Sequence, residues 1–155
     1  MKFNKLNFLF IFLLGGAFWI NANKEKKYQE MKKQSKKHLD LYLLMFDWLK
    51  FKQSQKDILC FFKKNNYKKI AIYGMSYVGK ALINELKGSD IEICYGIDQK
   101  ANILPSEIKT VSIDDQLSDV DVIVVTPISA YTQIEEKLRT IVMCDIVSIE
   151  EVIYY

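Results

Sequence analysis

The residues best suited to chemistry lie in one short stretch, Gly74-Met-Ser-Tyr-Val-Gly79. Gly74, Ser76 and Gly79 occupy the three fixed positions of the Gly-x-Gly-x-x-Gly pattern, in which a tight turn brings the start of a helix to the phosphates of a dinucleotide. Asp98 follows Gly79 by nineteen residues, where such sites place the carboxylate that accepts from a ribose. The spacing predicts a nucleotide site made by Gly74, Met75, Ser76, Tyr77, Val78, Gly79 and Asp98.

Ser76 departs from this pattern, because its position normally holds glycine. That glycine lets the backbone approach a pyrophosphate, and any side chain there intrudes. Serine adds only a hydroxymethyl group, whose hydroxyl can itself bond a phosphate. Two interpretations stay open: a bound nucleotide, or an empty pocket in which Gly74 makes the turn and Gly79 packs a helix on a sheet.

The carboxylate of Asp98 predicts which cofactor is preferred. It can accept from both ribose hydroxyls, and it would repel a 2′-phosphate. NAD is therefore expected to bind in preference to NADP. Any other nucleotide ligand, such as a nucleotide-sugar, is expected to carry an unphosphorylated ribose.

These residues must be positioned by alternating strands and helices. Apolar runs and helical spacing predict the following elements: strands over Lys69–Tyr73, Ile91–Ile97, Val120–Thr126 and Asp145–Ile149, a short strand near Lys109–Val111, helices over Asp57–Lys64, Tyr77–Lys87 and from Ser129 or Tyr131 to Thr140, a helical turn over Asp114–Leu117, and a loop over Asp98–Glu107. Such alternation predicts a small α/β domain over residues 57–155, with about five strands in a parallel sheet and right-handed crossovers.

The end of the Val120–Thr126 strand supplies a second wall of the expected site. Ligands of such sheets lie beyond the carboxyl ends of the strands, where the strand order reverses. The hydroxyls of Thr126 and Ser129 could donate to a phosphate or a sugar there, with Pro127 shaping the loop. The alternative is that Thr126 and Pro127 simply end the strand.

Catalytic side chains are scarce in this domain. His38 is the only histidine and precedes the domain, which excludes a histidine base or a Ser-His-Asp arrangement within it. Cys60, Cys94 and Cys144 form no Cys-x-x-Cys pair and are expected to be reduced core residues. The sequence therefore assigns no catalytic residue and no metal ligand.

Residues 1–22 are expected to anchor the chain in the cell membrane. Leu6–Ile20 is almost wholly apolar and approaches the length of a single span when its flanking residues are counted. Seven lysines follow it between Lys24 and Lys37, against two before it, so the positive-inside rule predicts a cytoplasmic domain. The alternative is a cleaved signal peptide ending near Ala22.

Charge divides the chain, although the total is only +3. Residues 24–69 hold fourteen lysines and five acidic side chains, a formal charge of +9, whereas residues 70–155 hold six basic and fourteen acidic side chains, a charge of −8. A basic stretch after a membrane segment predicts attraction to anionic lipids. The acidic domain and the single arginine of the chain argue against a nucleic acid partner.

Residues 23–56 are expected to form a charged stalk followed by an amphipathic helix. Neither glycine nor proline occurs between Asn21 and Gln53, and large apolar side chains crowd residues 39–51. So much apolar surface must be covered. Its own domain, a second copy of the chain and the membrane surface remain open; the domain is the simplest cover, and a homodimer through residues 39–51 is the next.

Three segments together resemble the Rossmann-like NAD(P)-binding superfamily: Gly-Met-Ser-Tyr-Val-Gly-Lys at 74–80, Tyr-Gly-Ile-Asp at 95–98 and Val-Asp-Val-Ile-Val-Val-Thr at 120–126. More narrowly, they look like small nucleotide-binding domains encoded among bacterial surface-polysaccharide genes and like the N-terminal domain of sugar O-acyltransferases. Over residues 68–155, the resemblance implies a nucleotide or nucleotide-sugar ligand and a glycan-assembly partner. It implies no catalysis, since the acyltransferases carry theirs on a β-helix that these segments do not contain.

Three functions follow as expectations. The pattern and the anchor, without catalytic residues, favour a membrane-tethered module that binds a nucleotide or nucleotide-sugar. The second is an NAD-dependent oxidoreductase or sugar-nucleotide epimerase completed by a partner chain. The third is a scaffold that binds no ligand.

Overall fold

The computed structural model describes the backbone of residues 5–99, 101 and 108–155, and the side chains of the same residues from Trp19 onwards. The chain divides into two compact units, residues 1–41 and 42–155. Helix α1 (Lys5–Gln53) accounts for the described part of the first unit, where the side chains from Trp19 to Leu39 are exposed.

The expected membrane anchor is not tested by these residues. In the part of the chain that the structure describes, no helix has both the length and the apolar character needed to cross a membrane. The side chains of residues 1–18, which hold most of the expected anchor, lie outside that part. The anchor over residues 1–22 stays a prediction.

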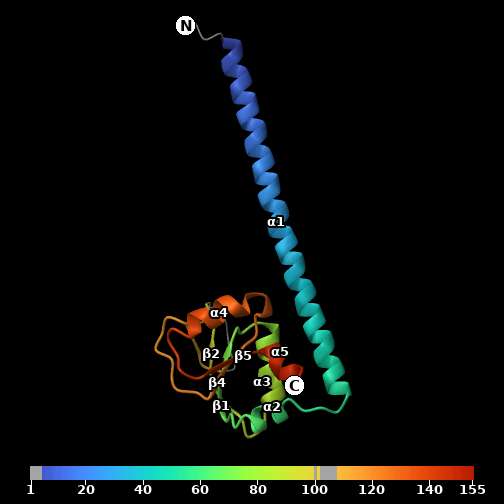
Figure 1. Ribbon diagram of the computed structural model, residues 1–155, viewed down its shortest axis with the longest axis vertical. Helices are drawn as coiled ribbons and strands as arrows, with labels where there is room; N and C mark the ends of the chain where they lie inside the picture. Colours follow the sequence, from blue (N-terminus) through green and yellow to red (C-terminus); the bar gives the residue numbers. More distant parts are fainter. Residues whose placement is uncertain (1–4, 100, 102–107) are drawn as a thin grey trace. The chain divides into compact units, whose positions relative to one another are not determined.

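The second unit is built on a parallel sheet of five strands (Figure 1). The strands are β1 (Lys69–Tyr73), β2 (Glu92–Ile97), β3 (Thr110–Val111), β4 (Val122–Val125) and β5 (Asp145–Ser148). They lie in the order β3-β2-β1-β4-β5, and every neighbouring pair is parallel. The predicted α/β class with about five parallel strands is therefore confirmed. The order reverses between β1 and β4, which makes their carboxyl ends the switch point of the sheet.

Besides α1, the described residues form five short helices, of which the first precedes β1 and the others connect or follow the strands. They are α2 (Leu59–Lys64), α3 (Tyr77–Leu86), the 3₁₀ turn η1 (Ile128–Ala130), α4 (Tyr131–Leu138) and α5 (Ile149–Ile153). Helix α3 follows β1, so its first turn lies at the carboxyl end of that strand. This places the Gly74–Gly79 stretch at the switch point.

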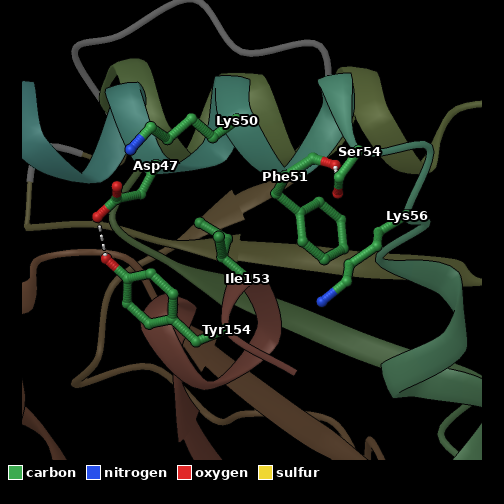
Figure 2. A pocket seen from close by; sticks show the side chains of 7 residues that line it. All are labelled: Asp47, Lys50, Phe51, Ser54, Lys56, Ile153 and Tyr154. Carbon is green, nitrogen blue, oxygen red and sulfur yellow. Dashed lines mark hydrogen bonds between the residues drawn. The ribbon is translucent and has the colours of Figure 1, made fainter.

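The end of α1 belongs to the second unit and packs on it through one face. Leu44 and Trp48 are only 2% and 5% exposed. Asp47 accepts a hydrogen bond of 2.7 Å from the hydroxyl of Tyr154 (Figure 2), and Lys52 forms an ion pair with Glu85 of α3. One side of the apolar 39–51 segment thus packs on its own domain, as expected.

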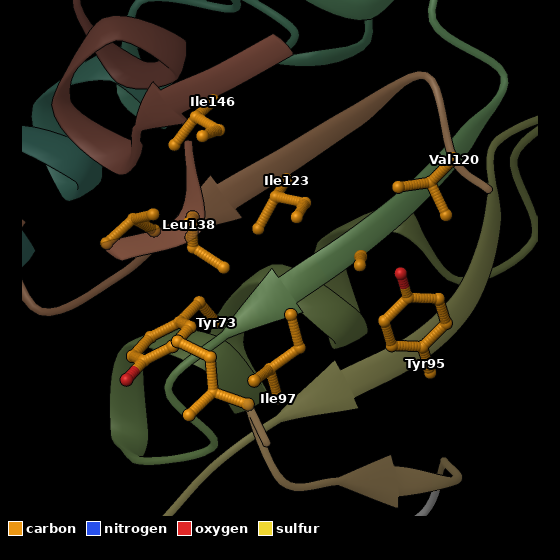
Figure 3. Packing of buried hydrophobic residues seen from close by; sticks show 10 residues of the cluster. Tyr73, Tyr95, Ile97, Val120, Ile123, Leu138 and Ile146 are labelled. Atoms are coloured by element: carbon orange, nitrogen blue, oxygen red, sulfur yellow. The ribbon is translucent and has the colours of Figure 1, made fainter. Parts of the chain in front are cut away.

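The core of the sheet has apolar residues on both faces. Under α4, buried side chains of four strands pack together with Leu138 (Figure 3). Strand side chains alternate between the two faces. Ile72 therefore faces the other side, where a Cβ atom on Gly79 of α3 would lie 3.6 Å from its Cγ2. Burial on both faces explains why these strands are continuous apolar runs.

Helix α5 was not expected. The sequence predicts a last strand over Asp145–Ile149, but β5 ends at Ser148 and a helix begins at Ile149. The hydroxyl of Ser148 accepts from Glu150 N at 3.2 Å, and the carboxylate of Glu151 accepts from Ser148 N at 2.9 Å. This capping box satisfies backbone N–H groups at the helix start, and its Ser-x-x-Glu signature is visible in the sequence.

The predicted helical turn over Asp114–Leu117 is also wrong. A tight turn forms instead, in which Asp115 N donates to the carbonyl of Ser112 at 3.2 Å. The carboxylate of Asp115 accepts from Ser112 N at 2.7 Å, and Ser112 Oγ accepts from Asp114 N. Such side-chain bonds to nearby backbone compete with helix formation. Within the expected loop over Asp98–Glu107, residues 100 and 102–107 lie outside the described residues.

Candidate functional site

The turn between β1 and α3 depends on glycine at Gly74. Its φ of +94° is a conformation that L side chains rarely adopt. A Cβ atom there would lie 2.7 Å from Thr126 Oγ1 and 2.9 Å from the ring of Pro127. The N–H of Gly74 donates to the carbonyl of Ile97 at 2.8 Å. The turn is thus held between the ends of β2 and β4.

Gly79 brings helix α3 into contact with that turn. A Cβ atom on Gly79 would lie only 2.2 Å from the carbonyl oxygen of Gly74. No L side chain fits there unless the backbone moves. The two glycines of the pattern therefore set the first turn of α3 directly against the carboxyl end of β1.

Asp98 takes part in the turn, a role that its spacing did not reveal. Its Oδ2 accepts from Met75 N at 2.9 Å, while its own N–H donates to Val111 O at 3.0 Å. The side chain of Met75 is buried, and a Cβ atom on Gly96 would lie 2.5 Å from its sulfur. Each carboxylate oxygen has two lone pairs, so the bond to Met75 N does not by itself exclude a ribose from Asp98. Binding of a ribose by Asp98 stays a prediction.

The first turn of α3 is open to an anion. Ser76 is its N-cap residue, but the Ser76 side chain makes no capping hydrogen bond, and the turn contains no acidic residue. Ser76 and Tyr77 are exposed, whereas Val78 is buried. The N–H groups of a first helical turn lack acceptors within the helix, and the helix dipole favours negative charge beside them.

Helix α5 shows the opposite arrangement at the carboxyl end of β5. Its N-terminus is closed by the capping box of Ser148 and Glu151, and Glu150 adds a second carboxylate to the first turn. Those carboxylates already occupy the place that an anion would take. Of these two helix starts, only that of α3 lacks both a side-chain cap and an acidic residue in its first turn.

Thr126 is turned inward. Its hydroxyl lies 3.0 Å from the carbonyl oxygen of Tyr73 and 2.9 Å from that of Gly74, and the residue is buried. The single hydroxyl proton is therefore directed at the backbone of the turn, and the expected donation by Thr126 to a phosphate or sugar is not favoured. Thr126 and Pro127 end β4 and pack against Gly74, as the alternative interpretation expects. Ser129 is exposed in η1.

Two kinds of side chain that could act as a base or nucleophile, a phenol and two thiols, have raised pKa values. Burial raises the pKa of the Tyr73 phenol at the end of β1, although Lys137 opposes the shift. Burial likewise raises the pKa of the Cys94 and Cys144 thiols. Cys60 is exposed, because α2 turns its neighbours Phe61 and Phe62 inward, so the prediction that all three cysteines are core residues is wrong for it.

Metal binding finds no support in the described side chains. Between Trp19 and Gln99, at Ala101 and from Ile108 onwards, no three His, Cys, Asp or Glu side chains gather to hold a metal ion. Asp121, one of the acidic residues near the start of β4, instead accepts from Lys68 N and Lys69 N at 2.7 Å each. These two bonds lower the pKa of Asp121 and fix the backbone at the start of β1.

The burial of Tyr95 predicts that the stability of this domain falls in alkali. Burial raises the pKa of Tyr95 from 10.0 to about 12, and its hydroxyl donates to Ser118 O at 2.7 Å. A raised pKa means that the stabilisation is complete below about pH 10 and is lost as the pH approaches about 12. Between about pH 10 and pH 12, the urea midpoint of wild type is therefore expected to fall with pH. In Tyr95→Phe, which has no phenol at this position, the midpoint should fall less steeply. Equal slopes would contradict the assignment.

A hollow of about 410 Å³ lies between the end of α1 and α5 (Figure 2). Its lining residues are Asp47, Lys50, Phe51, Ser54, Lys56, Ile153 and Tyr154. None of them belongs to the Gly74–Gly79 turn, so the hollow is separate from the candidate nucleotide site. Asp47 and Tyr154 bond to each other across it.

Comparison with protein-family models, with curated proteins and with solved structures finds no match to this chain. The strand order β3-β2-β1-β4-β5 is that of the first five strands of many dinucleotide-binding sheets. Sheets of this kind serve many functions, so a function for this chain must rest on the site itself.

Proposed function

We propose that this protein binds a nucleotide or nucleotide-sugar at the switch point of its sheet. The phosphates would lie on the first turn of α3 and the ribose near Asp98. One observation carries this proposal: the first turn of α3 has no side-chain cap and no acidic residue of its own, and Gly74 and Gly79 hold it at the carboxyl end of β1. Ser76 is exposed, and in this proposal its hydroxyl would donate to a phosphate.

The cellular setting of the proposal rests on the sequence. The apolar residues 6–20 and the lysines that follow them support a single-pass anchor with the sheet domain in the cytoplasm. The resemblance over residues 68–155 supports an accessory role in surface-polysaccharide or glycan assembly. The proposed protein is therefore a binding module that acts through a partner.

Binding without catalysis is the form of the proposal that the site supports best. Burial raises the pKa of Tyr73, Cys94 and Cys144, so these groups stay protonated at neutral pH and supply little phenolate or thiolate to act as a base or nucleophile. An oxidoreductase or epimerase would need its acid and base from another chain. A scaffold that binds no ligand remains a second candidate, because the side chains of Thr126 and Asp98 are both bonded to the turn itself.

Asp98→Asn tests the proposed site. Asparagine keeps an oxygen that can accept from Met75 N but loses the charge, so the turn is retained while the bond to the ribose weakens. We expect the affinity of the full-length chain for NAD to fall about tenfold, equivalent to about 1.4 kcal/mol, and the preference over NADP to shrink. Titration calorimetry with NAD, NADP and a UDP-sugar measures both.

Asp119→Asn is the matched control, because Asp119 is exposed and precedes β4 at the amino end of the strands. It removes the same charge and should leave binding unchanged. Tighter binding of NADP than of NAD, or equal affinities in wild type and Asp98→Asn, would show that Asp98 does not bind a ribose. If none of the three ligands binds, the scaffold is the better interpretation.

A further inference from the structure

Five large apolar side chains at the end of α1 remain uncovered. They form a surface that we call the seam: Tyr42, Leu43, Met45, Phe46 and Leu49, each between 38% and 64% exposed. The opposite side of the same helix carries the buried Leu44 and Trp48. Because that side fixes the helix on its own domain, the seam cannot turn inward. No residue that the structure describes covers it, and exposed apolar patches of this kind mark interaction sites.

The spacing of the seam fits a helix pair. Tyr42, Phe46 and Leu49 follow one another at intervals of four and three, and Leu39 precedes Tyr42 by three. This is the a/d repeat of a coiled coil, with Leu39 and Phe46 at a and Tyr42 and Leu49 at d. The rings of Tyr42 and Phe46 stack with centroids 6.4 Å apart, which presents a flat aromatic surface.

We propose that the seam pairs in parallel with the seam of a second copy of this chain. The flanking charges select this arrangement. Met45 occupies a g position and Lys50 the following e position. In a parallel pair, Met45 of one copy lies beside Lys50 of the second copy, whose stem can cover the apolar side chain. An antiparallel pair centred on the seam would instead set Lys36 against Lys50 of the second copy, two like charges.

The same pattern favours a helix partner over a lipid surface. A helix that lies on a membrane presents a wide apolar face, with its cations along the borders of that face. On this helix, Leu39, Tyr42, Phe46 and Leu49 keep the a/d repeat of a helix pair, and Leu43 at e and Met45 at g flank it. Lys50 lies over the ring of Phe46, with its ammonium 4.7 Å from the ring centroid.

The proposed pairing of two seams does not depend on the nucleotide site.

The double variant Phe46→Glu/Leu49→Glu tests the pairing. Sedimentation equilibrium of the full-length chain in density-matched detergent should show a dimer of the 18.1 kDa wild type. In the variant, the dimer dissociation constant should rise about 100-fold or more, since paired glutamates replace two apolar contacts in each copy. Both side chains are exposed in the single chain, so its circular dichroism spectrum should not change.

Met143→Glu is the matched control, because Met143 is a fully exposed apolar residue outside the seam. It should leave the dimer intact. A monomeric wild type at micromolar concentration would overturn the proposal, and so would a dimer that survives the double variant. A monomer that binds anionic vesicles through the seam would replace the second copy with lipid.

Disulfide cross-linking tests the direction of the pair. In a Cys60→Ser background, which removes an exposed thiol, Phe46→Cys places one new thiol at an a position of each copy. Parallel helices bring equivalent a positions together, so mild oxidation should yield a covalent dimer that Cys60→Ser alone does not form. Cross-linking only when Phe46→Cys chains are mixed with Tyr42→Cys chains would show an antiparallel pair and overturn the proposed direction.

Discussion

Gly79→Ala is expected to lower the free energy of unfolding by about 3 kcal/mol, the upper range for overpacking. Alanine is normally the better residue inside a helix, by about 0.5–1 kcal/mol. Here its Cβ atom would lie 2.2 Å from the carbonyl oxygen of Gly74, and a backbone atom cannot move aside as a flexible side chain can. Urea denaturation of the full-length chain measures the effect.

Gly88→Ala is the control for glycine replacement. Gly88 has a φ of +81°, and a Cβ atom there would meet nothing within 4 Å. We expect a cost of about 1–2 kcal/mol from the backbone conformation alone. Gly74→Ala combines such a conformation with contacts of 2.7 Å and 2.9 Å, so it should cost more than Gly88→Ala. Equal effects of all three changes would contradict the close contact between α3 and the turn.

Leu44→Ala and Leu49→Ala should separate the two sides of the same helix. Leu44 is 2% exposed, and its truncation is expected to cost about 2–5 kcal/mol of unfolding free energy. Leu49 is 55% exposed, and its truncation should change that free energy by no more than about 0.5 kcal/mol. Both are measured at a dilution where the unfolding midpoint no longer depends on protein concentration, so that dimer formation does not contribute.

The opposite order of these two effects would mean that the helix packs through its other side. The seam would then be the buried face, and the proposed dimer would lose its basis. At higher concentration, Leu49→Ala should weaken association while Leu44→Ala weakens folding. The two leucines are chemically identical, which makes the comparison a direct test of orientation.

Much of the sheet could be predicted because its strands are buried on both faces. The β1 bounds, Lys69–Tyr73, are those that the apolar run predicts, and β4 lies inside the predicted Val120–Thr126. A continuous apolar run between turn residues is a local signal. Helix α5 is five residues long, and its capping box at Ser148 is the feature that marks its start. Short elements set by capping are easily assigned to the preceding strand.

The candidate site could be predicted only in part, because its hydrogen bonds join distant residues. Met75 and Asp98 are 23 positions apart, and Thr126 lies 52 positions from Gly74. The pattern of glycines shows where the turn lies. It cannot show that Asp98 holds the backbone of that turn or that Thr126 points inward. Those bonds depend on the strand order, which brings the ends of β2 and β4 to either side of β1.

The orientation of the 39–51 helix also required the structure. Large apolar side chains lie nearly all round this segment, so periodicity alone does not select the face that meets the domain. The ion pair of Lys52 with Glu85 and the bond between Asp47 and Tyr154 lie on the packed side. With this side packed, the residues that the structure describes leave the seam exposed.

Nucleotide binding to the first turn of α3 is tested most directly by amide NMR of the isotope-labelled full-length chain. Addition of NAD or a UDP-sugar should shift the backbone amide resonances of Ser76, Tyr77, Val78 and Gly79 saturably and more than any others. The amides at the capped start of α5, from Ile149 to Val152, should stay in place. No saturable shift at α3, or larger shifts at α5 or around the hollow beside Tyr154, would contradict the proposed site.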